Sequence, residues 1–244
     1  MTLVQRDMRL EYRQTLLGIV WLVIQPVAAM LVFALVFGRL AQLPSGGVPY
    51  TSFALVGLTI WTFVSTGVSS AAESLVNDRD MITQVWFPRM LAPLSAVLSD
   101  TVRLLIAFVL MVPVFAIDGV VPPIQVLTLP LWILGAILLA MGAGLWLSAA
   151  YVLYRDVGHA LGFLLQGWLV ISPVAYSSSL VSDGWRYVYN LNPAAGLIDG
   201  MRWALLDGPS PGPQLAVSVG SLLLLCVSGL VWFRMAERVF ADTI

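Results

Sequence analysis

The sequence contains no lysine, and all 12 of its positively charged residues are arginines. A phosphate-binding loop of the Walker A type needs a lysine that reaches the nucleotide phosphates, so the chain cannot be an ATPase of that type. It also has a single cysteine, Cys226, and a single histidine, His159. An internal disulfide and a zinc site of the usual cysteine and histidine type are therefore excluded. Because His159 follows Arg155 and Asp156 at a predicted membrane edge, we expect it to be solvated, and we assign no catalytic residue or metal ligand.

Charge of either sign is scarce. Only 10% of the 244 residues are charged and 59% are hydrophobic, whereas soluble domains carry about 25% charged residues. A water-soluble fold has no means of hiding so much apolar surface, so we predict one integral membrane domain over residues 1–244. The net charge of −1 argues against nucleic acid as a partner, since phosphate binding needs clustered positive charge. The N-terminus lacks the pattern of a removable signal peptide, so insertion is expected to rely on the first span.

Apolar runs long enough to cross a bilayer, about 20 residues each, recur along the chain. We predict an all-α membrane protein with six transmembrane helices. Two lie in 19–72, two in 93–153, one in 159–176 and one in 215–233, followed by a tail over 234–244. The expected spans are Ile19–Leu40, Thr51–Ala72, Pro93–Ile117, Val126–Leu153, His159–Tyr176 and Leu215–Phe233.

Arginine placement predicts the orientation, because short cytoplasmic loops collect positive charge. Arg39, Arg186 and Arg202 fall on one side of the six spans, while eight arginines fall on the side that holds both ends of the chain. Both termini are therefore predicted to be cytoplasmic. The remaining arginine, Arg103, lies inside the third span, three residues after Asp100, on the same helical face. We predict an intramembrane ion pair, either structural or lining a pathway.

Three polar segments are predicted on the cytoplasmic side. Residues 1–18 place apolar side chains every four positions beside a stripe of arginines, which is typical of an amphipathic helix at the interface. Anchoring to lipid headgroups and docking to a partner both fit this helix. Residues 73–92 form a long loop with capping residues and a proline that ends a short surface helix. Residues 154–158 form a second, shorter loop.

The predicted external segment, residues 177–214, is rich in aromatic side chains. Its stretch from Ala194 to Leu206 is apolar and is expected to form a re-entrant or interfacial helix. An aromatic belt at the level of the headgroups is one interpretation of Trp185, Tyr187, Tyr189 and Trp203. The other is a platform on which sugar rings stack.

Five strings carry a resemblance to a known family. In order they are RDMRLEYRQTLLGIVWLVIQP at 6–26, VWFPRMLAPL at 85–94, YRDV at 154–157, PVAYSSSLV at 173–181 and LNPAAGLIDGMRWALLDG at 191–208. Over nearly its full length the chain resembles the membrane subunits of type-2 ABC transporters, in the branch that exports polysaccharides such as O-antigen, capsule or teichoic acid. It departs from the family in a shorter region before Arg6 and in the acidic Glu11.

The resemblance implies a homodimer in the bacterial inner membrane, surrounded by membrane lipids and bound to a separate cytoplasmic ABC ATPase dimer. ATP and Mg would be bound by that ATPase, with no cofactor in this chain. A lipid-linked glycan would pass between the two permeases. The residues implied in coupling to the ATPase are Arg6, Arg9, Arg13, Asp78, Arg79, Asp80, Trp86, Phe87, Pro88, Arg155 and Asp156. For the substrate path the resemblance implies Trp21 and Gln25. To these we add, as aromatic side chains suited to stacking on sugar rings, Trp61, Trp185, Tyr187, Tyr189 and Trp203.

Three alternative functions stay open from the sequence. A permease of the same architecture would serve a drug or a simple lipid, and adjacent glycosyltransferase genes would favour the polysaccharide instead. A membrane-embedded acyl or glycosyl transferase needs polar groups converging at one membrane face, and here they are scattered. The third alternative is a purely structural assembly subunit, but it would not explain the long loop at 73–92. Co-purification of an ATPase with the chain would exclude this alternative.

Overall fold

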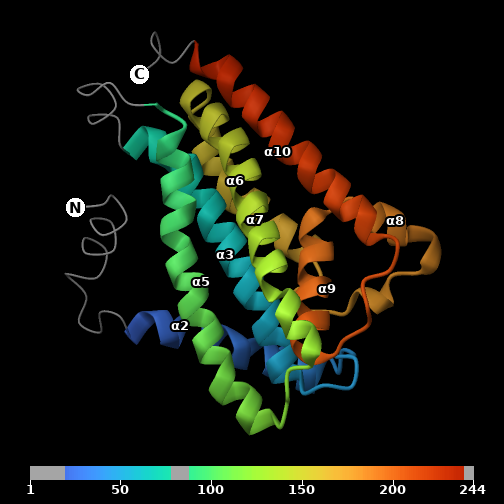
Figure 1. Ribbon diagram of the computed structural model, residues 1–244. Helices are drawn as coiled ribbons and strands as arrows, with labels where there is room; N and C mark the ends of the chain where they lie inside the picture. The colour runs from blue at the N-terminus through green and yellow to red at the C-terminus, as the bar shows by residue number, and fades with distance from the viewer. Residues whose placement is uncertain (1–19, 78–87, 239–244) are drawn as a thin grey trace.

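The computed structural model describes residues 20–77 and 88–238, and every regular element within those two ranges is helical (Figure 1). The predicted all-α class is therefore confirmed. The long helices run roughly alongside one another, and the shorter α8 and α9 lie toward one end of the bundle (Figure 1).

Four long helices correspond to predicted spans. They are α3 (Tyr50–Asn77), α5 (Leu91–Asp118), α6 (Leu129–Leu153) and α10 (Leu215–Glu237), and α6 is preceded by a 3-10 turn at Ile124–Thr128. With the stretch Val23–Leu40, five helices are long and apolar enough to cross a membrane. Both α3 and α10 extend beyond the predicted ends, because helical hydrogen bonding continues past the last apolar residues.

The fifth predicted span is shorter than expected. Helix α7 runs from Asp156 to Ile171, which gives 16 residues and a length of about 24 Å. It ends before Tyr176 because Ser172 precedes Pro173, and a residue before proline is driven out of the helical region. Ser172 accordingly has an extended backbone, with ψ at 148°. Six membrane crossings therefore remain a prediction.

The first predicted span is built differently from the others. Helix α2 (Trp21–Phe33) continues into a π-helical turn at Ala34–Leu40, and it runs crosswise to the long helices (Figure 1). Met30 is buried, but most of the other side chains described in α2 are partly or fully exposed. Because these exposed side chains are apolar, the helix has a large surface for lipid or for another chain.

The core is centred on α3 and α6, which approach each other closely through small residues. A Cβ at Gly144 of α6 would lie 2.6 Å from the Cβ of Ala71 in α3. On the other side of α6, a Cβ at Gly229 of α10 would lie 2.5 Å from the carbonyl oxygen of Gly142. Helices in membranes associate through such small residues, because lipid gives no hydrophobic drive for one helix to leave it for another.

Side chains cap two helices, one from a distant segment and one from the residue directly before the helix. Asp118, the last residue of α5, accepts hydrogen bonds from the backbone N–H and the hydroxyl of Ser52, at 3.1 and 2.5 Å, and from the hydroxyl of Thr51. It thereby caps α3. Asn192 caps α9 (Pro193–Leu206) by accepting from the N–H of Ala194 at 3.1 Å, with proline at the first helical position. The predicted external helix is therefore present.

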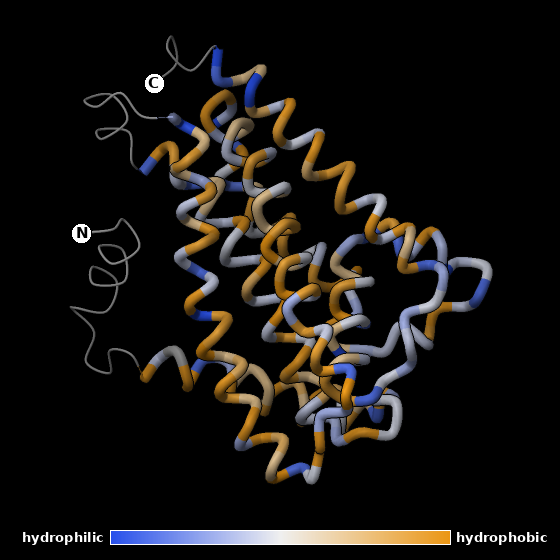
Figure 2. The backbone as a smooth tube through the Cα atoms, in the orientation of Figure 1, coloured by the Kyte–Doolittle hydropathy of each residue, from blue (hydrophilic) through white to orange (hydrophobic). Residues whose placement is uncertain are grey.

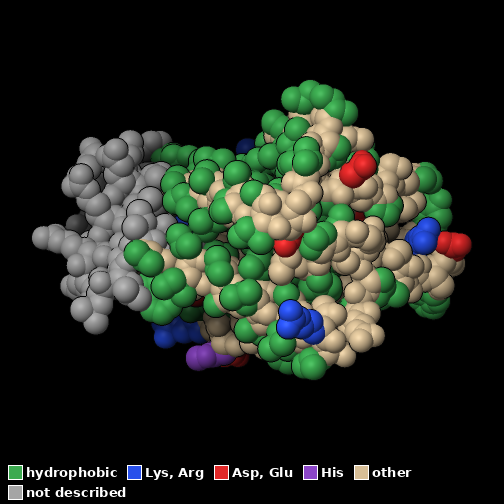
Figure 3. Space-filling model, turned by 90° about the horizontal axis from the view of Figure 1, so that it is seen from below, with side chains coloured by type: hydrophobic (Ala, Val, Ile, Leu, Met, Phe, Trp, Pro, Cys, Tyr) green, Lys and Arg blue, Asp and Glu red, His purple; other side chains and the backbone are tan. Residues whose placement is uncertain are grey.

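The polar residues gather at the ends of the bundle, and the long helices between them are predominantly hydrophobic (Figure 2). At one end Arg89 Nη1 donates to the carbonyl of Glu237 at 3.3 Å, which joins the start of α5 to the end of α10. Figure 3 views the other end, where apolar and uncharged side chains cover most of the surface and charged ones are few.

The contact between α6 and α10 predicts a clear difference between two glycines of the same helix. Gly229→Ala places a methyl group against backbone and should lower the free energy of unfolding by about 1–3 kcal/mol. Gly220→Ala meets nothing within 4 Å and should be neutral or slightly stabilising. Thermal unfolding in detergent, followed by tryptophan fluorescence, checks this. Equal melting temperatures for the two variants would contradict it.

Candidate functional site

A polar groove lies among three of the apolar helices. It has a volume of about 380 Å³ and is formed by α3, α5 and α7. Its lining combines serine and threonine hydroxyls with one arginine and one glutamine. The residues are Trp61, Ser65, Thr66, Ser69, Ser70, Arg103, Leu165, Gln166 and Leu169.

The hydroxyls of the groove belong to a continuous stripe on α3. Thr62, Ser65, Thr66, Ser69 and Ser70, which we call the hydroxyl stripe, recur at helical spacing and are all at least partly exposed. Ser65 and Thr66 donate to the carbonyl of Thr62, at 3.1 and 2.8 Å. Their donors are thus satisfied within the helix, and their oxygen lone pairs stay available to a polar solute.

Charge enters the groove from α5. Arg103 Nη1 lies 3.0 Å from Asp100 Oδ1, and the Arg103 side chain is 30% exposed while that of Asp100 is 4% exposed. The carboxylate therefore sits behind the guanidinium and balances its charge. Spacing alone predicted this pair but left its role open. Because Arg103 also lines the groove, the pair presents charge-balanced hydrogen-bond donors to it.

Tryptophans bound the groove on the side of α9. Trp61 is 7% exposed and meets Trp168 of α7 edge to face, with the ring centroids 5.7 Å apart. Trp168 Nε1 donates to Asn192 Oδ1 at 2.8 Å, and Asn192 Nδ2 donates to Ser172 Oγ at 2.9 Å. The residue that caps α9 therefore also holds the end of α7 in place.

The segment after α7 depends on one buried side chain of α9. Arg202 is 5% exposed, and its guanidinium donates to the carbonyls of Pro173 at 2.6 Å and Val174 at 2.8 Å. Longer hydrogen bonds, both 3.4 Å, reach the carbonyls of Tyr176 and Phe53. The carbonyl of Ala175, which lies between Val174 and Tyr176 in the sequence, instead accepts a hydrogen bond from the hydroxyl of Tyr50. Every carbonyl from 173 to 176 thereby receives a donor that the ended helix no longer supplies.

Arg202 also packs closely against α3. Its guanidinium carbon lies 3.5 Å from the centroid of the Phe53 ring, a cation–π geometry. Gly57 permits this approach, because a Cβ there would lie 2.6 Å from Arg202 Nη2. The sequence reasoning placed Arg202 on the external surface and missed this role. An arginine inside the apolar stretch Ala194–Leu206 was the available signal, since a charge there requires buried partners.

The structure separates the residues predicted for the substrate path. Trp61 lines the groove, whereas Trp203 packs edge to face on Trp132 with centroids 6.5 Å apart. Trp185 and Tyr187 are 66% and 56% exposed, and the hydroxyl of Tyr189 donates to that of Tyr176 at 3.1 Å. Trp21 and Gln25 are exposed on α2 and do not line the groove. The sequence reasoning did not identify the hydroxyl stripe, although its spacing was visible in the sequence.

Of the residues predicted to couple to an ATPase, three are described and all are exposed. Pro88 precedes α5, and Arg155 and Asp156 form the turn between α6 and α7. The others lie outside the described residues, and so does most of the predicted interfacial and coupling helices. They are Arg6, Arg9, Arg13, Asp78, Arg79, Asp80, Trp86 and Phe87.

Long apolar helices beside an open polar groove are the architecture of a multi-pass membrane protein. The model of the ABC-2 type transporter family matches residues 1–206, and the chain belongs to that family. Membership implies an ATPase partner and a transported substrate. The chain is thus a transport subunit rather than an enzyme.

Two relatives match almost the whole chain. The O-antigen export system permease protein RfbA of Myxococcus xanthus is 28% identical over 247 residues, which cover 100% of this chain and 94% of that protein. A protein of the same name from Klebsiella pneumoniae is 22% identical over 240 residues, with coverages of 97% and 91%. The resemblance drawn from the five sequence strings is therefore confirmed.

Arg202 should be hard to replace. Arg202→Met removes the donors for four carbonyls, and because buried unsatisfied carbonyls are costly, we expect a loss of about 3 kcal/mol or more in unfolding free energy. Arg202→Lys should recover only part of this, because an ammonium lacks the planar fork. Arg234→Met, at an exposed position on α10, serves as the control. A melting temperature of Arg202→Met within a degree of the control would refute this role.

Proposed function

We propose that this chain is the permease subunit of an ATP-driven exporter that moves a polysaccharide across the bacterial inner membrane. The polymer would be an O-antigen or a capsular or teichoic-acid-like glycan, carried on a polyprenyl lipid. The observation that carries the proposal is the hydroxyl stripe, a row of hydrogen-bonding groups along the middle of the membrane-length helix α3. The names of the relatives support a glycan over a drug or a simple lipid.

The groove favours a second copy of the chain as the partner. Hydroxyl, amide and guanidinium groups facing hydrocarbon have no water to bind and are therefore costly to leave there. A second copy placed against α3, α5 and α7 would enclose them in a shared channel. The exposed apolar surface of α2 would give such a dimer further area to bury. In this arrangement each copy contributes one wall of hydroxyls to the glycan path.

The cytoplasmic side is proposed to be the end that holds Pro88, Arg155 and Glu237. Arg89, Arg155, Arg234 and Arg238 come from three connections that meet near this end, as the positive-inside rule expects. An ATPase dimer that binds ATP and Mg would dock here, on the turn at 154–157 and the loop around 78–88, and residues 1–18 are proposed to contribute a further contact. Closure of its two subunits would be transmitted through these contacts and would widen the channel.

Blocking the hydroxyl stripe should stop export. Ser65→Leu introduces an apolar, bulky group into the groove, and we expect at least a tenfold fall in polysaccharide at the cell surface, with lipid-linked polymer accumulating inside. Ser228→Leu is the matched control, since Ser228 donates to its own helix at 3.1 Å just as Ser65 does, but lies on α10. Surface glycan is measured by antibody binding. Normal export by a Ser65→Leu protein present at normal levels would count against the proposal.

Coupling to the ATPase should depend on the predicted loop. Replacing both Arg79 and Asp80 by alanine removes two charges of opposite sign from the loop, so the purified complex should keep hydrolysing ATP while export falls at least tenfold. Arg234→Ala with Glu237→Ala removes the same two charge types at the end of α10 and should leave export unchanged. ATP hydrolysis and surface glycan are measured on the same strains. Undiminished export in the loop variant would argue that the ATPase docks elsewhere.

A further inference from the structure

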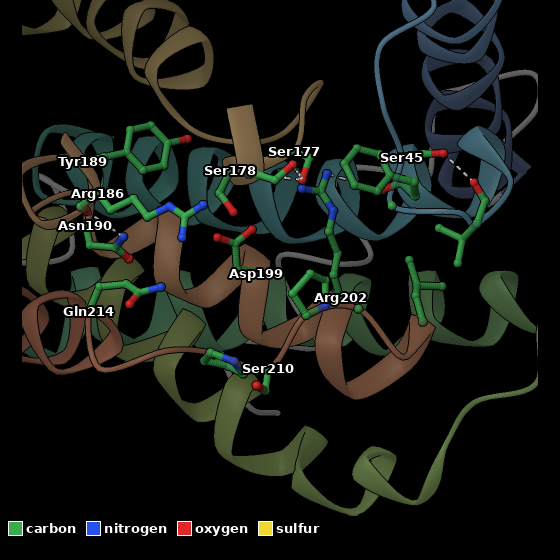
Figure 4. A pocket seen from close by; sticks show the side chains of 18 residues that line it. Ser45, Ser177, Ser178, Arg186, Tyr189, Asn190, Asp199, Arg202, Ser210 and Gln214 are labelled. Atoms are coloured by element: carbon green, nitrogen blue, oxygen red, sulfur yellow. Dashed lines mark hydrogen bonds between the residues drawn. The ribbon is translucent and has the colours of Figure 1, made fainter. Parts of the chain in front are cut away.

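A second cavity, separate from the groove, lies at the end of the bundle opposite Pro88. Its volume is about 180 Å³, and four segments enclose it: the loop after α2, the segment leading into α8, α9 itself, and the connection from α9 to α10. Figure 4 shows it from close by. The polar residues that line it include Ser178, Arg186, Asn190, Asp199 and Gln214.

Asp199 is the central acceptor of this cavity. Figure 4 shows Ser178 and Arg186 pointing toward it from the segment that faces α9. Ser178 donates a hydrogen bond to its carboxylate, and the side chain stays partly exposed. Burial raises the pKa of Asp199, while the bond from Ser178 and the charge of Arg202 oppose that rise. A carboxylate in this setting has lone pairs left to accept hydrogen bonds from a ligand.

The charges on the cavity wall are balanced in pairs. The charge of Arg202, whose guanidinium donates to backbone carbonyls, is opposed by that of Asp199, and Arg186 Nη1 lies 3.0 Å from Asp183 Oδ1. The described residues contain no group of three or more side chains suited to holding a metal ion. The cavity is thus poorly matched to a free anion or a cation. What it offers is a mixture of neutral donors and acceptors around one carboxylate.

Two amide side chains, those of Asn190 and Gln214, line the wall. The amide of Gln214 supplies both donors and an acceptor, whereas Asn190 is 6% exposed and its Oδ1 already accepts from the hydroxyl of Ser218 at 3.0 Å. Asn190 Nδ2 is engaged with the carbonyl of Arg186 at 2.9 Å, which holds that amide in a defined position. A ligand rich in hydroxyl groups satisfies such a set, because each hydroxyl both donates and accepts.

Size and shape agree with a six-membered ring. An engineered cavity of about 150 Å³ holds benzene, so the present cavity has room for one ring of that size with its substituents. The aromatic rings of Phe53 and Tyr189 also line the wall. Because the Arg202 guanidinium covers one face of the Phe53 ring, Tyr189 is the ring that would pack against the apolar C–H face of a sugar, while the polar groups bind its edge.

We propose that this cavity binds one neutral sugar residue, of the pyranose type, at the extracytoplasmic end of the permease. Two parts of this proposal rest on the proposed function: that the sugar belongs to an exported polysaccharide, and that the cavity lies on the extracytoplasmic side of the membrane. The binding site itself rests on the cavity, its compensated charges and its hydroxyl-binding groups. Such a site would hold a leading sugar as it leaves the channel.

The full chain, purified in lipid nanodiscs, tests the site without any transport. Methyl α-glycosides of glucose, mannose, galactose and rhamnose are titrated in the millimolar range, and binding is followed by saturation-transfer NMR. At least one should bind saturably, and Asp199→Asn should weaken that binding at least tenfold. Because Asp199 is enclosed and its variant is at risk of misfolding, Gln214→Leu and Ser178→Ala provide further variants, each expected to weaken binding at least threefold. Ser182→Ala, at an exposed position four residues after Ser178, should bind as the unaltered chain does.

The outcomes separate this proposal from the proposed function. Absence of saturable binding for all four glycosides, or equal binding by Gln214→Leu, Ser178→Ala and the unaltered chain, overturns the sugar site and leaves polysaccharide export standing. Binding that follows the expected order supports the site, whatever the outcome of export measurements. If cells lacking the chain still export their polysaccharide, that result overturns the export function and not the sugar site. Ser65→Leu, in the groove, should bind glycosides normally while losing export.

Discussion

The guanidinium of Arg202 holds together three parts of the chain that are far apart in sequence. Helix α7 ends at Ile171, and the carbonyls that follow lose their helical donors in a region poor in water. Arg202, from α9, supplies most of those donors and also contacts Phe53 of α3. The groove and the cavity described above both depend on this contact. The end of α7 bounds the groove, and α9 and the segment before α8 line the cavity.

Helix α3 serves two purposes with two faces. One face packs through small residues against α6, so closely that Gly144 and Ala71 nearly touch. The other carries the hydroxyl stripe, which α5 and α7 leave open. Close packing on the first face needs no polar group, because van der Waals contact suffices between helices in lipid. The second face can therefore be polar without weakening the bundle, which suits a helix that lines a path.

Much of the fold was predictable from residue types alone. Apolar length identified α3, α5, α6 and α10, and the apolar stretch Ala194–Leu206 indicated α9. The spacing of Asp100 and Arg103 placed them on one face. The site was less accessible. Whether Trp203 faces a path or the core depends on its contact with Trp132, more than 70 positions away, and no local pattern contains that information.

The sequence by itself determined that the chain is helical and lies in a membrane, because hydrocarbon requires long apolar segments with internally paired backbones. Because the chain has no lysine, it cannot form a Walker A loop, and ATP hydrolysis by such a loop must come from another chain. Tertiary structure alone decided where the few polar residues go. Arg202 and Trp203 are neighbours in one helix, yet the first satisfies backbone carbonyls and the second packs on an aromatic ring. The reason is physical: a buried polar group is set by the partners around it, and those partners come from segments that only folding brings together.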